Sequence, residues 1–325
     1  MKPPIWFERP VLSDLVDDVA GRVIVLGPPD DGLYQGVEGA VGALAGSGIY
    51  DANFMDHAPR VLAIARMGIG VDTVDISEAT RRGIAVCNAP DGPTVSTAEH
   101  AIMLLLMVAK HTLQSIDRLR RTEEDMYGRN HALELMGKKL GLVGYGRIAR
   151  RVGAAALGLG MEVMVYDPFI STLPDEVVRA PELAELLSSV DAVSVHIPLT
   201  AETRHLFDAA AFATMRDGSI FINTARGGLV DQRALLAAVD SGHLWGAGLD
   251  VTEPEPLPSD HPLLQRENVI VTPHVASGTT QGKRNSFTMA LDQLIEVAAG
   301  NRPSNLVNPA AWERVAARWR EEWAT

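Results

Sequence analysis

The chain has 325 residues, enough for two domains, and its 46% hydrophobic and 22% charged residues are ordinary for a soluble globular protein. The formal net charge of -12 argues against a partner dominated by phosphate backbone, because affinity for nucleic acid depends on clustered Lys and Arg. A single cysteine, Cys87, excludes an internal disulfide and a thiolate metal cluster, and we expect it to be a small buried residue. We therefore expect a cytoplasmic protein that binds no metal and no nucleic acid.

Short apolar runs alternate with helical patterns along the chain, which indicates parallel sheets with helical crossovers. The first strands are expected at 23–26, 61–65 and 84–87, followed by a long helix at 97–121 and an irregular stretch to 131. A second series of strands is expected at 140–143, 162–166, 192–196, 219–223, 247–251 and 269–272. The most apolar segment, 101–109, is shorter than the ~20 residues of a membrane span, so we expect a buried helix and no membrane partner.

Two helices are expected at the end of the chain, at 280–299 and 310–323. The first carries an apolar face made of Phe287, Ala290, Leu291, Leu294 and Val297. The second carries Trp312, Val315, Trp319 and Trp323 on one side at helical spacing. We expect this side to pack on the core of its own chain, the alternative being a contact between two copies.

A glycine-rich turn, Gly144-Tyr-Gly-Arg-Ile-Ala149, follows the strand expected at 140–143. Gly144 permits the tight turn, Gly146 lets the backbone approach a pyrophosphate, and Ala149 allows close packing of helix on strand. Asp167 ends the next strand, where a carboxylate accepts ribose hydroxyls. Its charge repels a 2′-phosphate, so NAD is favoured over NADP. The alternatives are a turn that serves packing alone and a solvated acid.

The position of this turn in mid-chain predicts the domain organisation. We expect an α/β protein with two Rossmann-like, doubly wound domains, each with a parallel sheet. Residues 1–99 and 288–325 are expected to form a discontinuous, flavodoxin-like substrate-binding domain, into which residues 100–287 are inserted as an NAD-binding Rossmann domain. The long helices near the two crossings suggest hinge closure around an active site.

Polar residues follow three later strands, at the edge where an open parallel sheet binds its ligand. Arg226, Glu255 and His274 are an arginine, a carboxylate and a histidine that suit oxidation of a 2-hydroxy acid. Arg226 would hold the substrate carboxylate, His274 would move the hydroxyl proton, and Glu255 would orient the imidazole and raise its pKa. Taken singly, each has an alternative: a surface ion pair, a solvated loop acid or a strand-end polar residue. A zinc site is disfavoured, because no His/Cys pair has ligand spacing.

Several segments, in order and approximate spacing, resemble the D-isomer-specific 2-hydroxyacid dehydrogenases, which include phosphoglycerate, glycerate and hydroxypyruvate enzymes. These segments are Gly141-Leu-Val-Gly-Tyr-Gly-Arg-Ile, His196-Ile-Pro-Leu-Thr200, Asn223-Thr-Ala-Arg-Gly-Gly, residues 250–256 and Pro273-His274. The resemblance implies that Arg226, Glu255 and His274 are catalytic. With Gly144, Gly146 and Asp167, it implies cofactor contacts from Thr97, Arg147, Ile148, His196, Pro198, Thr203, Thr224 and Asp250.

The resemblance also identifies a substrate loop at 66–72 in the first domain. It implies that backbone N–H groups at Gly68 and Ile69 receive the substrate carboxylate. Arg66 fits a position seen in phosphoglycerate-type members, where it would contact a phosphate; a charge that anchors the strand end is the alternative. Tyr127 stands where the family commonly has a tryptophan. The resemblance implies a homodimer, and at this length we do not expect the regulatory domain that long phosphoglycerate dehydrogenases append.

Three functions compete for this sequence. The first is a reversible NAD-linked dehydrogenase, in use as a reductase of small 2-keto acids. The second is an NAD-sensing binding protein, since transcriptional corepressors of this family keep the fold. The third is a formate-type dehydrogenase, which pairs its histidine with a glutamine, and Glu255 argues against it. The complete trio favours the first.

Overall fold

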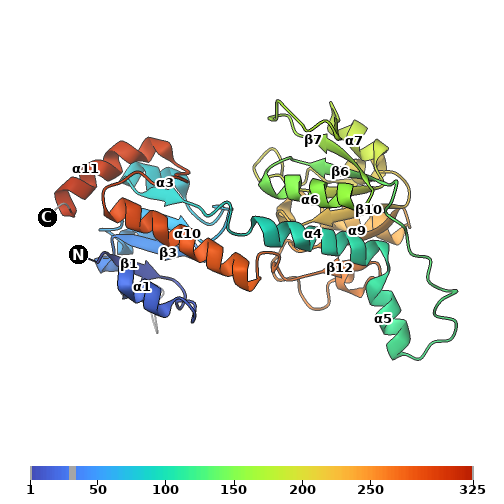
Figure 1. The fold of residues 1–325 in the computed structure, drawn as a ribbon, viewed down its shortest axis with the longest axis horizontal. Coiled ribbons are helices and arrows are strands. Elements are labelled where there is room, and N and C mark those ends of the chain that lie inside the picture. The colour runs from blue at the N-terminus through green and yellow to red at the C-terminus, as the bar shows by residue number, and fades with distance from the viewer. Residues whose placement is uncertain (1, 29–33, 324–325) are drawn as a thin grey trace. The chain divides into compact units, whose positions relative to one another are not determined.

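The computed structural model describes residues 2–28 and 34–323, so residues 1, 29–33 and 324–325 of the expected substrate domain lie outside the described part. The chain forms two compact units, residues 1–93 with 278–325 and residues 94–277 (Figure 1). The division falls just before two long helices, α4 (Thr94–Ala109) and α10 (Thr280–Ala298). The expected boundaries, after 99 and after 287, lie inside these helices, each of which belongs to one unit throughout.

The first unit contains a five-stranded parallel sheet in the order β2-β1-β3-β4-β5. Its strands are β1 (Pro4–Phe7), β2 (Ile24–Leu26), β3 (Gly42–Ala45), β4 (Ala63–Arg66) and β5 (Ala85–Cys87). Its other helices are α1 (Val16–Arg22), η1 (Val37–Gly39), α2 (Ala52–His57), α3 (Ile76–Arg82), η4 (Pro309–Ala311) and α11 (Trp312–Glu322). This strand order, 2-1-3-4-5, is the flavodoxin-like order, as predicted.

Successive side chains of a strand point to opposite faces, and both faces of this sheet are buried. Ile5 and Phe7 of β1 pack with α10 and α11 in one apolar cluster, whereas Trp6 packs in a second cluster with Phe54 of α2. The predicted face of α10 is buried, and Val315 and the tryptophans of α11 join the first cluster. The last helix therefore packs on its own core, as expected.

The second unit contains a seven-stranded parallel sheet in the order β12-β11-β10-β9-β6-β7-β8. Its strands are β6 (Lys139–Val143), β7 (Glu162–Tyr166), β8 (Val177–Arg179), β9 (Ala192–Val195), β10 (Ser219–Asn223), β11 (Leu244–Leu249) and β12 (Val269–Val271). Its other helices are α5 (Thr112–Arg120), α6 (Arg147–Gly158), α7 (Leu183–Ser189), α8 (Ala209–Thr214), η2 (Gly227–Leu229), α9 (Gln232–Asp240) and η3 (Pro262–Gln265). The strand order reverses between β6 and β9, which is the switch point where doubly wound sheets bind ligands.

Three strands and one helix break were not predicted. β1 begins at Pro4. Proline has no N–H to donate, but it is tolerated as the first residue of a strand. β3 has the sequence GALA, whose small residues carry little strand propensity although all four are buried. β8 is a three-residue edge strand. The helix expected at 97–121 is divided between α4 and α5, because His111 adopts a left-handed backbone with φ of 49°.

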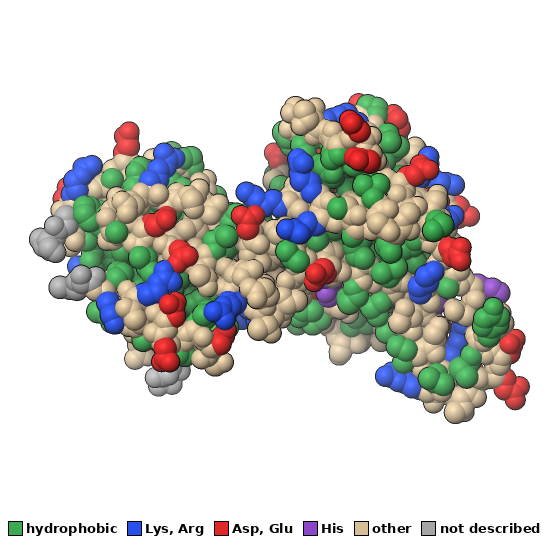
Figure 2. All heavy atoms as spheres, in the orientation of Figure 1, with side chains coloured by type: hydrophobic (Ala, Val, Ile, Leu, Met, Phe, Trp, Pro, Cys, Tyr) green, Lys and Arg blue, Asp and Glu red, His purple; other side chains and the backbone are tan. Residues whose placement is uncertain are grey.

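The surface and the cysteine agree with an ordinary globular chain. Acidic and basic side chains are intermixed on the visible face of each unit (Figure 2). Among the described helices, none combines the length and the apolar character needed to cross a membrane. Cys87 is 0% exposed, and burial raises the pKa of its thiol to about 12, which confirms the prediction of a buried structural residue.

Candidate active site

The loops that follow β10 and β11 approach each other closely. A Cβ added at Gly227 would collide with the backbone carbonyl of Thr252, so only glycine fits there. Asn223, 0% exposed at the end of β10, braces the same loop: its side chain donates to the Arg226 carbonyl at 2.8 Å and accepts from the Ala225 N–H at 2.9 Å. Gly227 and the Asn223 side chain, for which no role was predicted from the sequence, therefore fix the segment that carries Arg226.

Glu255 and His274 form a hydrogen-bonded pair. His274 Nδ1 lies 2.8 Å from Glu255 Oε2, and Glu255 Oε1 accepts the Thr252 N–H at 3.0 Å. Their side chains are 37% and 47% exposed, so the pair is accessible. With Nδ1 directed at the carboxylate, Nε2 of His274 is the nitrogen left to exchange a proton with a reactant.

The charge of this pair follows from its surroundings. Partial burial acts to raise the pKa of Glu255, but hydrogen bonds from His274 and the Thr252 N–H, together with the positive charges of His274 and Arg226, hold that pKa below its ordinary value. Glu255 is therefore ionised near pH 7. An imidazole held at Nδ1 by a carboxylate, with Nε2 left for a reactant, is an arrangement suited to acid/base chemistry.

Arg226 belongs to the same constellation. Its Nη1 donates to the Ala225 carbonyl at 2.6 Å, and its positive charge contributes to the lowered pKa of Glu255. Arg226 as a residue is half-buried. The structure thus brings the three predicted catalytic residues into one region of the second unit.

Asp250 lies beneath this group and is 1% exposed. Its Oδ1 accepts from Thr272 Oγ1 at 2.6 Å and from the Val275 N–H at 2.9 Å, and its Oδ2 accepts from the Ala276 N–H at 2.8 Å. Its backbone carbonyl accepts the His274 N–H at 2.7 Å. The residue predicted only as a cofactor contact therefore holds the segment that carries His274, and a sequence alone cannot display these bonds.

The glycine turn lies at the end of β6, at the switch point. Gly144 has a φ of 87°, and a Cβ there would lie 2.8 Å from the His196 carbonyl oxygen. Ala149 is 0% exposed between α6 and the sheet, which agrees with the predicted packing role. Asp167 accepts the Tyr145 N–H at 2.8 Å and the Phe169 N–H at 2.9 Å, so its carboxylate lies beside the turn. Each carboxylate oxygen has a second lone pair for another donor.

Other predicted cofactor residues lie at neighbouring strand ends. His196 follows β9; burial lowers its pKa to about 4, so the ring is neutral near pH 7, with Nε2 2.9 Å from Ser194 Oγ. Thr203 Oγ1 donates to the Pro198 carbonyl at 2.8 Å, which places both in one turn. Thr97 is buried on α4, whereas Arg147 and Ile148 open α6.

The predicted substrate loop belongs to the first unit. The Gly68 carbonyl accepts the Ala89 N–H at 2.8 Å, and the Ile69 carbonyl accepts from the Asn88 side chain at 2.8 Å. In a trans peptide the C=O and the next N–H point in opposite directions, so the Ile69 N–H is turned away from residues 88–89. Arg66 Nε donates to the Gly70 carbonyl at 3.2 Å, which ties its side chain to the loop.

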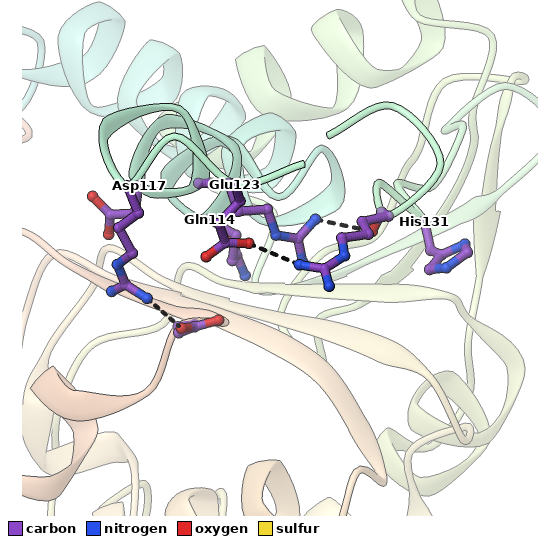
Figure 3. A pocket seen from close by; sticks show the side chains of 8 residues that line it. Gln114, Asp117, Glu123 and His131 are labelled. Atoms are coloured by element: carbon purple, nitrogen blue, oxygen red, sulfur yellow. Dashed lines mark hydrogen bonds and ion pairs between the residues drawn. The ribbon is translucent and has the colours of Figure 1, made fainter. Parts of the chain in front are cut away.

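A separate hollow of about 350 Å³ contains none of the predicted residues. It lies at α5, the loop that follows it and residue 267, as Figure 3 shows. Its lining residues are Gln114, Asp117, Arg118, Arg121, Glu123, Arg129, His131 and Glu267. Ion pairs join Arg129 to Glu123 at 3.1 Å and Arg121 to Glu267 at 4.0 Å. Its charged groups are largely matched with each other, so we do not assign it to catalysis.

Comparison with known proteins gives consistent matches. Residues 102–276 match the family model described as "D-isomer specific 2-hydroxyacid dehydrogenase, NAD binding domain". The chain is 40% identical over 262 residues to D-3-phosphoglycerate dehydrogenase of Archaeoglobus fulgidus, covering 79% of this chain and 49% of that protein. It is 41% identical over 250 residues to (S)-sulfolactate dehydrogenase of Chromohalobacter salexigens, covering 75% of this chain and 80% of that protein.

A solved structure, the TT0316 protein of Thermus thermophilus, superposes with a TM-score of 0.85 at 37% identity, covering 94% of this chain and 99% of that chain. The chain spans about half the length of the phosphoglycerate dehydrogenase relatives that it matches, 49% for those of Archaeoglobus fulgidus and Methanocaldococcus jannaschii.

The residues at the switch point fit the NAD of that family model. A Cβ at Gly146 would meet no atom within 4 Å, so the backbone there is open to a ligand. Thr224 is 8% exposed, and its Oγ1 is buried without a hydrogen-bond partner among the described residues. A buried hydroxyl without a partner is costly unless a ligand satisfies it. The open backbone, this hydroxyl and the Asp167 carboxylate suit the phosphates and hydroxyls of a dinucleotide.

Removal of the Thr224 hydroxyl is expected to weaken NADH binding without lowering the stability of the free protein. In T224V, we expect NADH to bind about 3- to 10-fold more weakly, because one hydrogen bond is lost, while the melting temperature stays equal or rises, because the free protein loses an unpartnered polar group. Titration calorimetry and thermal unfolding measure the two quantities. T80V is the matched control, since Thr80 Oγ1 is bonded to the Ile76 carbonyl at 2.7 Å in the other unit. Unchanged NADH affinity in T224V would contradict the assignment.

Proposed function

The chain belongs to the D-isomer specific 2-hydroxyacid dehydrogenase family, and from this premise we propose that it interconverts a small D-2-hydroxy acid and its 2-keto acid with NAD. The observation that carries the proposal is the 2.8 Å contact between His274 and the ionised Glu255, close to the positive charge of Arg226. A proton carrier, its orienting carboxylate and a carboxylate-binding cation are the groups that this reaction needs. Their assembly favours the enzyme over an NAD-sensing binding protein.

NAD, when bound, supplies or accepts the hydride. In the reducing direction, protonated His274 gives the proton on Nε2 to the carbonyl oxygen of the keto acid, which becomes the hydroxyl. Glu255 keeps the ring oriented through Nδ1 and stabilises the imidazolium. In the oxidising direction, neutral His274 removes the hydroxyl proton through the same nitrogen.

Two groups are proposed to hold the substrate. Arg226 binds its carboxylate through the planar guanidinium and polarises the adjacent carbonyl. The loop of the first unit contributes the backbone N–H groups of Gly68 and Ile69, and Arg66 contacts the remaining part of the substrate. The orientation of the Ile69 N–H, which follows from the bonded Gly68 carbonyl, supports this role.

The catalytic assignment is tested with a panel of keto acids: glyoxylate, hydroxypyruvate, its phosphorylated form and the keto acid of sulfolactate. We expect the wild type to oxidise NADH with at least one of them, and more efficiently than NADPH, because Asp167 repels a 2′-phosphate. H274A is expected to lower kcat by about 100-fold or more while the Kd for NADH changes little, since general acid catalysis contributes about that factor.

H57A, which removes a histidine of α2 in the other unit, is the control and should match the wild type. Equal kcat in H274A and H57A would remove His274 from the mechanism. R66A extends the same panel: a loss confined to phosphorylated or sulfonated substrates is expected if Arg66 contacts the distal anion. An equal effect on all substrates would show instead that Arg66 anchors the strand end.

We also propose that the enzyme is a homodimer formed through the second unit. α5 and the loop after it extend from the body of that unit (Figure 1). They expose apolar side chains, with Leu119 63% and Tyr127 96% accessible. A groove of about 290 Å³ between α4 and α6 is lined by apolar residues together with Glu99 and Arg151, a pair of opposite charges that a two-fold axis is able to match.

The assembly is measured by light scattering coupled to size exclusion. We expect the wild type to have twice the 34.9 kDa mass of the chain. The L119D dimer should dissociate at a higher protein concentration than the wild-type dimer, because the substitution places a charge in the buried contact. F169D is the control, since Phe169 is 96% exposed outside the arm. A monomeric wild type, or equal behaviour of the two variants, would refute a dimer through this arm.

We also propose that the protein is located in the cytoplasm, and cell fractionation tests this location.

A further inference from the structure

One histidine near the site takes no part in the mechanism described above. His100 lies on α4, and its side chain is 13% exposed. Its Nε2 lies 2.9 Å from Thr272 Oγ1 and 3.4 Å from Asp250 Oδ1. Side chains from α4 and from the end of β12 thus meet at the buried carboxylate that follows β11, next to the segment that carries His274.

The direction of these hydrogen bonds follows from their chemistry. Asp250 as a carboxylate only accepts, and it already accepts the Val275 and Ala276 N–H groups. Thr272 Oγ1 lies 2.6 Å from Asp250 Oδ1, so the single hydroxyl hydrogen of Thr272 is directed at the carboxylate. Because that hydrogen is committed, His100 Nε2 must donate to the Thr272 oxygen and therefore carries a proton. His100 thus completes the set of donors around the carboxylate.

The segment held by this carboxylate has an uncommon backbone conformation. His274 has a φ of 52°, in the left-handed region that only a few per cent of residues other than glycine adopt, although histidine is found there more often than most. Such a backbone persists only where its surroundings over-determine it. Here the residues on both sides, Thr272 before and Val275 after, are bonded to the same Asp250 oxygen. Anything that orients Asp250 and Thr272 consequently orients the His274 ring.

We propose that His100 is a positioning residue for the proposed acid/base His274. Through the Thr272 hydroxyl and the Asp250 carboxylate, it fixes the segment 272–276, so that His274 Nδ1 meets Glu255 and Nε2 is presented to the substrate. His100 itself touches neither reactant nor His274. The effect of His100 on kcat rests on the proposed function, whereas its effect on the tautomer of His274 rests on geometry alone.

Two variants separate positioning from packing. H100L keeps the volume but removes the donor, whereas H100Q places an amide N–H close to the position of Nε2. We expect H100L to lower kcat for keto acid reduction by about 10-fold or more, the factor that corresponds to the about 1.5–3 kcal/mol contributed by a hydrogen bond to a charged group, with the Kd for NADH within about threefold. H100Q should recover kcat to within about threefold of the wild type. H57L is the matched control and should equal the wild type.

A second readout needs no turnover. In protein labelled with ¹⁵N-histidine, long-range proton–nitrogen correlation spectra identify which ring nitrogen carries the proton. We expect neutral His274 to be protonated at Nδ1 in the wild type and in H100Q, because Glu255 accepts from that nitrogen. In H100L, His274 should show a mixture of the two tautomers, because the ring is no longer held.

The outcomes are distinct for the two proposals. If no keto acid is reduced by the wild type, the proposed function fails and the spectra alone decide: an unchanged His274 tautomer in H100L would overturn the positioning role. If the wild type is active, kcat decides. A wild-type kcat in H100L would overturn the positioning role, because it would show that no hydrogen-bond donor is needed at this position. Equal losses of kcat in H100L and H100Q would also overturn it, because they would show that only the shape of the ring matters.

Discussion

The buried carboxylate of Asp250 is the constraint on which the rest of the site depends. A charged group that is 1% exposed is stable only if donors surround it, and the donors here are consecutive groups of one short segment. Satisfying the carboxylate therefore dictates the backbone path on both sides of His274, including its left-handed conformation. The position of the imidazole is thus a consequence of the hydrogen bonds to Asp250, whereas Glu255 fixes the rotation of the ring through Nδ1.

The topology explains why these groups meet. In a parallel sheet all carboxyl ends lie at one edge, so residues after β10, β11 and β12 converge although they are far apart in the chain. Gly227 lets two of these loops touch, because its missing side chain allows the loop of Arg226 to rest against the carbonyl of Thr252. The same edge carries the glycine turn and Asp167 at the switch point.

The fold of both units and the candidate catalytic residues could be predicted from the sequence, for physical reasons. Buried strands are continuous apolar runs, and the glycine turn has one structural solution, so the Rossmann-like second unit and the flavodoxin-like first unit were predicted. β3 was missed, because its small residues are buried by tertiary packing that no local pattern records. The pairing of Glu255 with His274 followed from motif order. The bonds of Asp250, the role of Gly227 and the approach of His100 depend on distances between separate strands, which composition and spacing do not contain.

The most direct test concerns the contact between Glu255 and His274, in which Oε2 lies 2.8 Å from Nδ1. Because the pKa of Glu255 is held below its ordinary value, both of its carboxylate oxygens only accept hydrogen bonds near pH 7. In E255Q the ring loses this charged acceptor, so we predict that kcat for keto acid reduction falls about 10-fold or more while the Kd for NADH changes little. Equal kcat in E255Q and the wild type would contradict the account.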